Sequence, residues 1–153
     1  MLHCIRHKQL LTTNLNTAWE FISHPANLQK ITPPDLNFQV LSELKGVKMY
    51  QGQIIEYIVS PFKGVNTHWV TEITHVKDLE FFVDEQRMGP YKFWHHQHIL
   101  KPVSGGVEMT DIVHYKLPMG WLGLLINHWI VKRKLEHIFH YRMKILNEHF
   151  NLR

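Results

Sequence analysis

The residues of this chain whose types and spacing could carry out chemistry are three clustered histidines and an aspartate that follows them. His95, His96 and His98 stand in one run of strand-forming residues, and Asp111 stands in the next. Because side chains alternate along a strand, His96 and His98 share one face and His95 takes the other. The short loop at 104–106 predicts a hairpin that brings Asp111 beside His98 on the same face.

Two imidazoles and a carboxylate are compatible with three kinds of chemistry. They could bind a metal ion, act as general acid and base, or make hydrogen bonds within a binding pocket. No further metal ligand is evident, and no nucleophile or nucleotide-binding motif accompanies the group. We therefore expect no metal and no cofactor. His96, His98 and Asp111 are the candidates for catalysis, and polar contacts within an apolar pocket are the interpretation we prefer.

Turn sequences at regular intervals predict that this polar group stands in an antiparallel sheet. Glycine-containing pairs such as Lys45-Gly46 and Gly89-Pro90 separate runs rich in β-branched and aromatic residues. The predicted strands are 2–12, 36–44, 53–60, 66–75, 79–88, 91–103 and 107–117. The first strand is predicted to pair with the last.

Two short helices are predicted after the first strand. Thr17 and Glu20 have the spacing of a capping box, which predicts a helix over 17–23. A second helix is predicted over 27–31, before two prolines.

Residues 118–150 predict one long amphipathic helix. Its stripe at helical spacing consists of Trp121, Leu124, Val131, Leu135, Ile138, Phe139, Arg142 and Leu146. This is the element able to cover the buried face of the sheet. The first half of the helix is apolar all round, so we expect it to contact a second apolar surface. That surface could be a ligand, a partner, a membrane or a covering loop.

Strand alternation also predicts which side chains line a hollow between a curved sheet and this helix. If Val76 pairs with Leu79 across the turn at 77–78, then Trp69 lies opposite Gln86 on the inner face. The predicted ligand-binding residues are Trp69, Phe82, Asp84, Gln86, Trp94, His96, His98, Asp111 and Tyr115 of the sheet and Leu125 and Trp129 of the helix.

Several of these segments carry a resemblance to a known superfamily. The runs at 82–86, 89–98 and 105–115, with 31–38 and Gly52, resemble the ligand-binding SRPBCC proteins of the START-like, polyketide cyclase-like superfamily. The resemblance implies the α+β helix-grip fold, in which a seven-stranded antiparallel sheet grips a long C-terminal helix and encloses a cavity for a hydrophobic ligand. Relatives include carriers, hormone and quinone binders, cyclases and dehydratases, so the resemblance indicates fold more strongly than function.

Composition limits the other possibilities. The 153 residues suit one domain, 1–153, and a single cysteine, Cys4, excludes an internal disulfide. The charged start lacks the apolar run of a signal peptide, so we expect a cytoplasmic protein. Scattered basic residues and the absence of a recognition motif argue against nucleic acid. The basic trio at 132–134 beside Trp129 could contact anionic lipid, but a solvated helix face is the preferred interpretation.

The sequence therefore predicts a protein that binds a hydrophobic or aromatic small molecule, such as a lipid, a quinone or a polyketide-like compound. The alternative is a cyclase or dehydratase in which His96 or His98 acts as acid or base. The sequence leaves the oligomeric state open.

Overall fold

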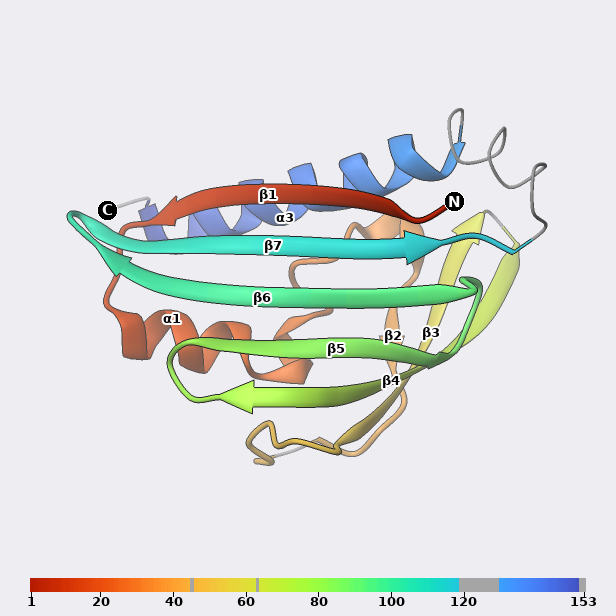
Figure 1. Cartoon of the computed structure of the whole chain (residues 1–153), viewed down its shortest axis with the longest axis horizontal. Coiled ribbons are helices and arrows are strands. Elements are labelled where there is room, and N and C mark those ends of the chain that lie inside the picture. The colour runs from red at the N-terminus through yellow and green to blue at the C-terminus, as the bar shows by residue number, and fades with distance from the viewer. Residues whose placement is uncertain (45, 63, 119–129, 152–153) are drawn as a thin grey trace.

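The architecture is a seven-stranded antiparallel sheet with a long helix along one of its faces (Figure 1). The computed structural model describes residues 1–44, 46–62, 64–118 and 130–151. The strands are β1 (His3–Leu11), β2 (Gln39–Val40), β3 (Ile54–Phe62), β4 (Val65–Lys77), β5 (Phe81–Met88), β6 (Phe93–Val103) and β7 (Gly106–Lys116). Their order in the sheet is β1-β7-β6-β5-β4-β3-β2. The predicted meander, with the first strand paired to the last, is confirmed.

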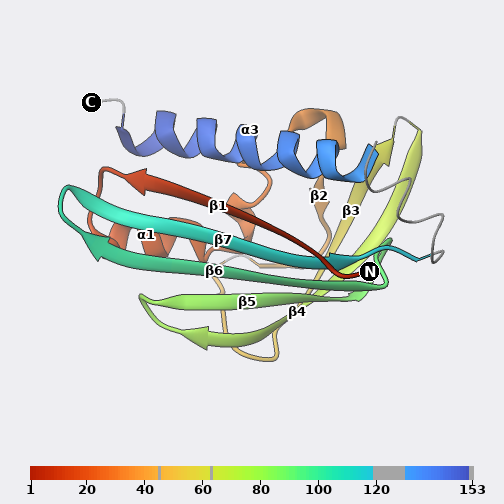
Figure 2. The same cartoon turned by 45° about the horizontal axis from the view of Figure 1, so that its top comes forward.

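Two helices lie on the same side of this sheet. They are α1 (Leu15–Ile22) and α3 (Lys132–Asn151), and the short 3₁₀ helices η1 (Pro25–Asn27) and η2 (Pro34–Leu36) follow α1. β3 and β4 curve towards the start of α3 (Figure 2). Register shifts interrupt the β3–β4 and β4–β5 ladders, and such bulges increase local twist and bending. No helix in the described residues is long and apolar enough to cross a membrane.

The start of α1 differs from the predicted capping box. Asn14 is the N-cap, and its side chain accepts a hydrogen bond of 2.9 Å from the Thr17 backbone N–H. The helix therefore begins before Thr17, because the asparagine supplies the capping oxygen.

The segment between α1 and β3 contains less regular structure than predicted. The expected helix at 27–31 is replaced by η1, which begins at Pro25. The expected strand at 36–44 is reduced to β2, because η2 extends to Leu36 and Asn37 adopts a left-handed conformation with φ of 43°. The pairing of β2 with β3 can therefore begin only after this turn.

The long terminal helix is confirmed in its described part, which is α3. Residues 119–129 of the predicted helix lie outside the described residues. Pro118 precedes them and is not helical.

The predicted pairing of β4 with β5 is wrong by three residues beside the turn, where Val76 pairs with Phe82, and by two further along the strands. Thr71 pairs with Gln86 and Ile73 with Asp84, whereas the two-residue turn predicted Trp69 opposite Gln86. The turn is longer than expected, and Leu79 within it has a left-handed φ of 65°. The register irregularity between Ile73 and His75 reduces the shift to two residues. A shift of two preserves alternation, so the same side chains still share the inner face.

One end of the space between the sheet and α3 is filled by an apolar core. We call it the packed end. Its buried members come from α1, the segment between η1 and η2, the sheet and the last turns of α3: Leu11, Ala18, Trp19, Ile22, Ile31, Phe82, Leu100, Val107, Met109, Leu146 and Phe150. Because α1, the sheet and the end of α3 pack against one another here, the position of α3 on the sheet is fixed.

Candidate functional site

The middle of the space between the sheet and α3 is hollow. A cavity of about 340 Å³ lies there, within the range of small-molecule pockets. Most of its lining is apolar and comes from residues 22–38, the inner faces of β3 to β6, and α3. Curvature of the sheet therefore leaves a space that the side chains do not fill.

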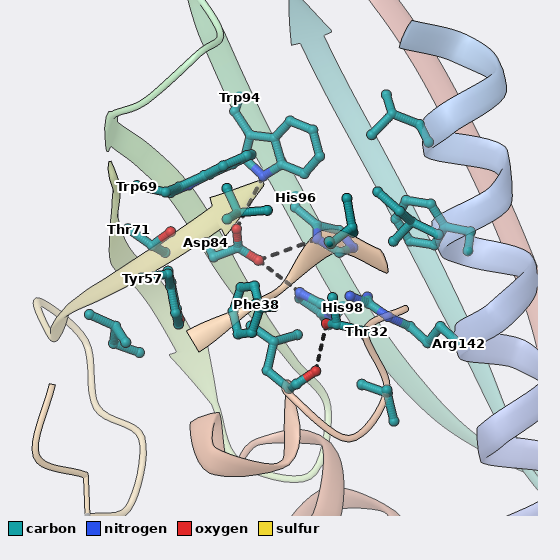
Figure 3. A pocket seen from close by; sticks show the side chains of 18 of the residues that line it. Thr32, Phe38, Tyr57, Trp69, Thr71, Asp84, Trp94, His96, His98 and Arg142 are labelled. Atoms are coloured by element: carbon teal, nitrogen blue, oxygen red, sulfur yellow. Dashed lines mark hydrogen bonds and ion pairs between the residues drawn. The ribbon is translucent and has the colours of Figure 1, made fainter. Parts of the chain in front are cut away.

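Five ionisable side chains form a polar cluster at one wall of this cavity. They are Asp84 of β5, His96 and His98 of β6, Asp111 of β7 and Arg142 of α3. Figure 3 shows four of them around the hollow, with Arg142 reaching in from the helix. His98 and Asp111 are direct partners across the β6–β7 ladder, so the predicted neighbourhood of these two residues is confirmed.

The two histidines lie between the two carboxylates. The His96 Nε2 lies 2.8 Å from the Asp111 Oδ1, and its Nδ1 lies 3.3 Å from the Asp84 Oδ2. The His98 Nε2 lies 2.8 Å from the same Asp84 oxygen, and its Nδ1 lies 3.0 Å from the Asp111 Oδ1. The other Asp84 oxygen accepts a 3.2 Å hydrogen bond from the Trp94 indole N–H. Each carboxylate thus has a nitrogen of both imidazoles within 3.3 Å.

The charges of this cluster determine its protonation. Burial opposes ionisation of Asp84 and Asp111, but the two imidazoles outweigh it and hold the pKa of each carboxyl below its usual range. Burial alone would lower the pKa of His96, yet the two carboxylates raise it above its ordinary value. The two carboxylates therefore face positive groups: His96, whose protonated form they favour, and the Arg142 guanidinium, which lies 3.6 Å from Asp111.

Aromatic side chains surround the cluster. The Trp69 and Trp94 rings meet edge to face at 5.2 Å, and Tyr91 lies 4.8 Å from Trp94. On the facing side Phe38 and Tyr57 lie 4.9 Å apart. Burial, with the nearby Asp84 charge, raises the pKa of Tyr57, so its phenol keeps its proton and can donate a hydrogen bond. These rings offer flat apolar contact surfaces for a ligand.

The structure places the predicted site residues in three groups. Those that line the cavity are Trp69, Phe82, Asp84, Trp94, His96 and His98. Those that do not line it are Gln86, Asp111 and Tyr115. Those outside the described residues are Leu125 and Trp129.

The three that do not line the cavity have other contacts. Asp111 lies behind the two histidines, and Tyr115 packs in a core cluster with Leu135. Gln86 braces the β5–β6 turn, since its side chain donates to the Tyr91 carbonyl at 2.7 Å and accepts from the Tyr91 N–H at 3.1 Å. These placements correct the predicted lining.

Sequence reasoning missed Arg142, Tyr57, Thr71 and Tyr91, all of which line the cavity. A signal for Arg142 was present, because a permanently charged residue interrupts an otherwise apolar helical stripe. Long charged side chains are rarely buried without a partner or a ligand.

His95 lies on the opposite face of β6, as alternation predicts. Its Nδ1 lies 2.7 Å from the Glu85 carboxylate, away from the cavity. It therefore takes no part in the polar cluster.

A metal could be held by Asp84, His96 and His98, whose ligand atoms all lie within 4.8 Å of one another. The third ligand is then Asp84 in place of Asp111, the residue considered from the sequence. Protons on the imidazoles satisfy the same contacts at 2.8 and 3.3 Å without an ion. Our expectation of no metal thus stays a prediction.

Comparison with solved structures places this geometry in a known fold. The chain matches the Zhui aromatase/cyclase from Streptomyces sp. R1128 with a TM-score of 0.70, 11% identity and coverage of 96% of this chain and 94% of that one. It matches Ara h 8.0201 with a TM-score of 0.62, 12% identity and coverage of 97% and 99%. This chain has the helix-grip fold. Both neighbours are members of the SRPBCC superfamily, so the predicted fold is confirmed.

Another neighbour is protein CV1439 from Chromobacterium violaceum, with a TM-score of 0.73, 15% identity and coverage of 99% of each chain. No family model and no curated protein matches the sequence. At these identities the likeness concerns the helix-grip fold alone. The function must be argued from the cavity.

Proposed function

We propose that this protein binds an apolar or aromatic small molecule in the cavity between its sheet and α3. The observation that carries the proposal is the hollow of about 340 Å³, apolar over most of its lining and polar at one wall. Such a site combines burial of apolar surface with a few polar groups that fix the orientation of the ligand. The superfamily neighbours are ligand-binding proteins, which supports the same class of function.

The polar cluster supports binding more directly than catalysis. Each histidine faces both carboxylates, so these contacts hold the imidazoles in place. A general base needs an imidazole nitrogen with a free lone pair towards the substrate. The contacts of His96 instead engage both of its ring nitrogens.

A titration with the neutral apolar fluorophore Nile red tests the proposal. The probe should bind saturably, one per chain, with a blue-shifted emission.

Thr71→Trp should abolish this binding because Thr71 is buried and lines the cavity, and the larger ring would fill it. Thr74→Trp, on the same strand but outside the lining, is the matched control and should bind as the wild type does. Folding of both variants is checked by circular dichroism. Non-saturable binding, or equal binding by the folded Thr71→Trp protein, would refute the cavity as the site.

The second candidate is acid–base catalysis on a bound keto or polyketide-like substrate. One observation favours it: the His98 imidazole lines the cavity beside two carboxylates that can hold its tautomer. For a binder, His98→Asn should lower affinity by about 1 kcal/mol, the cost of one lost hydrogen bond. For an enzyme, the same change should reduce turnover by roughly a hundredfold with affinity nearly intact. Binding and turnover are therefore measured on the same variant.

A further inference from the structure

Arg142 has hydrogen-bonding capacity that the described part of the protein leaves unused. The residue is 6% exposed and lines the cavity from α3. Its Nε and Nη1 atoms are buried and have no hydrogen-bond partner among the described residues. The guanidinium packs 5.0 Å from the Phe139 ring, which supplies no acceptor oxygen. A buried, charged donor in this state is costly unless another molecule supplies the acceptor.

Asp111 does not fill this role. Its Oδ1 lies 3.6 Å from the Arg142 Nη1, beyond good hydrogen-bond distance. The same oxygen already lies 2.8 Å from the His96 Nε2 and 3.0 Å from the His98 Nδ1. The carboxylate is thus oriented towards the two imidazoles, and it balances the guanidinium charge without satisfying its donors.

A second polar atom without a hydrogen bond lies near the same point. The His98 Nδ1 is buried and, despite its distance to Asp111, is not aligned for a hydrogen bond. His98 is held in position on its other side, because its ring stacks on Phe82 at 4.1 Å and its Nε2 contacts Asp84. Figure 3 shows the Arg142 and His98 side chains at one wall of the hollow.

The free hydrogen-bonding capacity of the cavity favours an anion over a cation. Among the described lining residues, Asp84 is the one acid, whereas Lys134 and Arg142 are permanent cations. Asp84 is also occupied, since its two oxygens contact Trp94, His96 and His98. An incoming carboxylate would therefore meet the unsatisfied guanidinium, while an incoming cation would meet no free carboxylate.

We propose that the ligand is an apolar carboxylic acid whose carboxylate is bound by Arg142, with His98 beside it. This inference rests on the proposed binding function and specifies the chemical class of the ligand. A guanidinium and a carboxylate form charge-assisted hydrogen bonds, the strong class of such contacts. The apolar part of the ligand occupies the aromatic and aliphatic part of the cavity, where Trp69, Trp94 and Tyr57 stand.

Displacement of Nile red by two ligands with matched tails tests this inference. Decanoate and 1-decanol carry the same apolar chain and differ in the charged head. Wild-type protein should bind decanoate at least about tenfold more tightly, as expected for charge-assisted hydrogen bonds. In Arg142→Gln the preference should disappear, with decanol affinity unchanged. Lys134→Gln removes the other lining cation and should keep the preference.

The readout is the ratio of the two affinities within each protein, so a moderate loss of stability in a variant does not obscure it. Arg142→Lys, which keeps the charge without the planar donor array, provides a second test and should retain part of the preference. Equal affinity of decanoate and decanol for the wild type would overturn the inference and leave the binding function standing. A preference retained in both Arg142 variants would also overturn it. Failure of decanoate, decanol and Nile red alike would refute the binding function itself.

Discussion

Two stretches of the same helical stripe face very different surroundings. Leu146 and Phe150, near the end of α3, pack into the solid apolar core closed by α1. Phe139 and Arg142, earlier on the same stripe, line the hollow that contains the polar cluster. Both stretches are buried, so burial does not distinguish them. They differ in whether side chains of the sheet and of α1 pack directly against the helix or leave a hollow beside it.

The difference separates stability from function along one element. At the packed end α1 fills the space under the sheet, and its residue Trp19 belongs to the core and does not line the cavity. Around Phe139 and Arg142 the bulged ladders of β3, β4 and β5 form a curved wall that leaves a space. We therefore expect substitutions at the packed end to change the free energy of unfolding and those at the cavity to change binding.

Leu146→Ala should produce the largest effect. Leu146 is 1% exposed in the packed end, and a Leu-to-Ala change in such a core costs about 2–5 kcal/mol of unfolding free energy. Urea denaturation measures the loss. The affinity of the folded variant for Nile red should match that of the wild type, and a parallel loss of affinity would show that the two regions are not separable.

Trp94→Ala should show the converse behaviour. The Trp94 ring lines the cavity and contacts Trp69 and Tyr91, so its removal enlarges the pocket and takes away a binding surface. Affinity for Nile red should fall by about tenfold or more, equivalent to about 1.4 kcal/mol. The loss of unfolding free energy should be smaller than the loss at Leu146. If instead fold and binding are lost equally, Trp94 belongs to the structural core.

The pH dependence of stability should identify the polar cluster. The pKa of Asp84 and Asp111 is lowered by folding, so their contribution is present above the usual carboxyl value of 3.8 and is lost as the pH falls below it. The pKa of His96 is raised, so its contribution is complete below 6.5 and is lost as the pH rises through the higher folded value. The contribution of the cluster to the free energy of unfolding should therefore be greatest between pH 3.8 and pH 6.5.

Urea denaturation from pH 4 to pH 9 measures the alkaline side of this profile. In His96→Gln the decline on the alkaline side should flatten, because the variant lacks the group that binds the extra proton. His95→Gln, on the outer face of the same strand, is the matched control and should keep the wild-type slope. An identical alkaline slope in wild type and His96→Gln would contradict the assignment.

Addition of a metal should produce the smallest effect. Protons already satisfy the contacts of Asp84, His96 and His98, so Co²⁺ should give no stoichiometric absorption spectrum and no thermal shift. One Co²⁺ bound per chain, and lost in Asp84→Asn, would establish a metal centre in place of the proton-linked cluster.

The same contrast explains what could be predicted from the sequence. Strand alternation placed Trp94, His96 and His98 on the inner face, because side-chain period is a local property of the chain. The His98–Asp111 pair was also predictable, since a short hairpin loop fixes its register. The helix-grip order of elements followed from turns and helical periodicity.

The rest depended on contacts between distant segments. The β4–β5 register required a left-handed Leu79, a conformation that a leucine rarely adopts and that local sequence does not indicate. Thr71 and Tyr57 were missed because cavity lining depends on how far the curved sheet stands from α3. Arg142 could be seen in the sequence as a charge within an apolar stripe. That its donors have no hydrogen-bond partner can be established only from the positions of the strands that face α3.

The central claim is that the cavity holds an apolar small molecule. Native mass spectrometry of the protein purified from its own host, followed by solvent extraction, tests it most directly. The account predicts a complex with one small apolar molecule per chain, and the same mass increment should be absent from folded Thr71→Trp purified in parallel. Wild-type protein that carries no such molecule, or a mass increment that persists in Thr71→Trp, would contradict it.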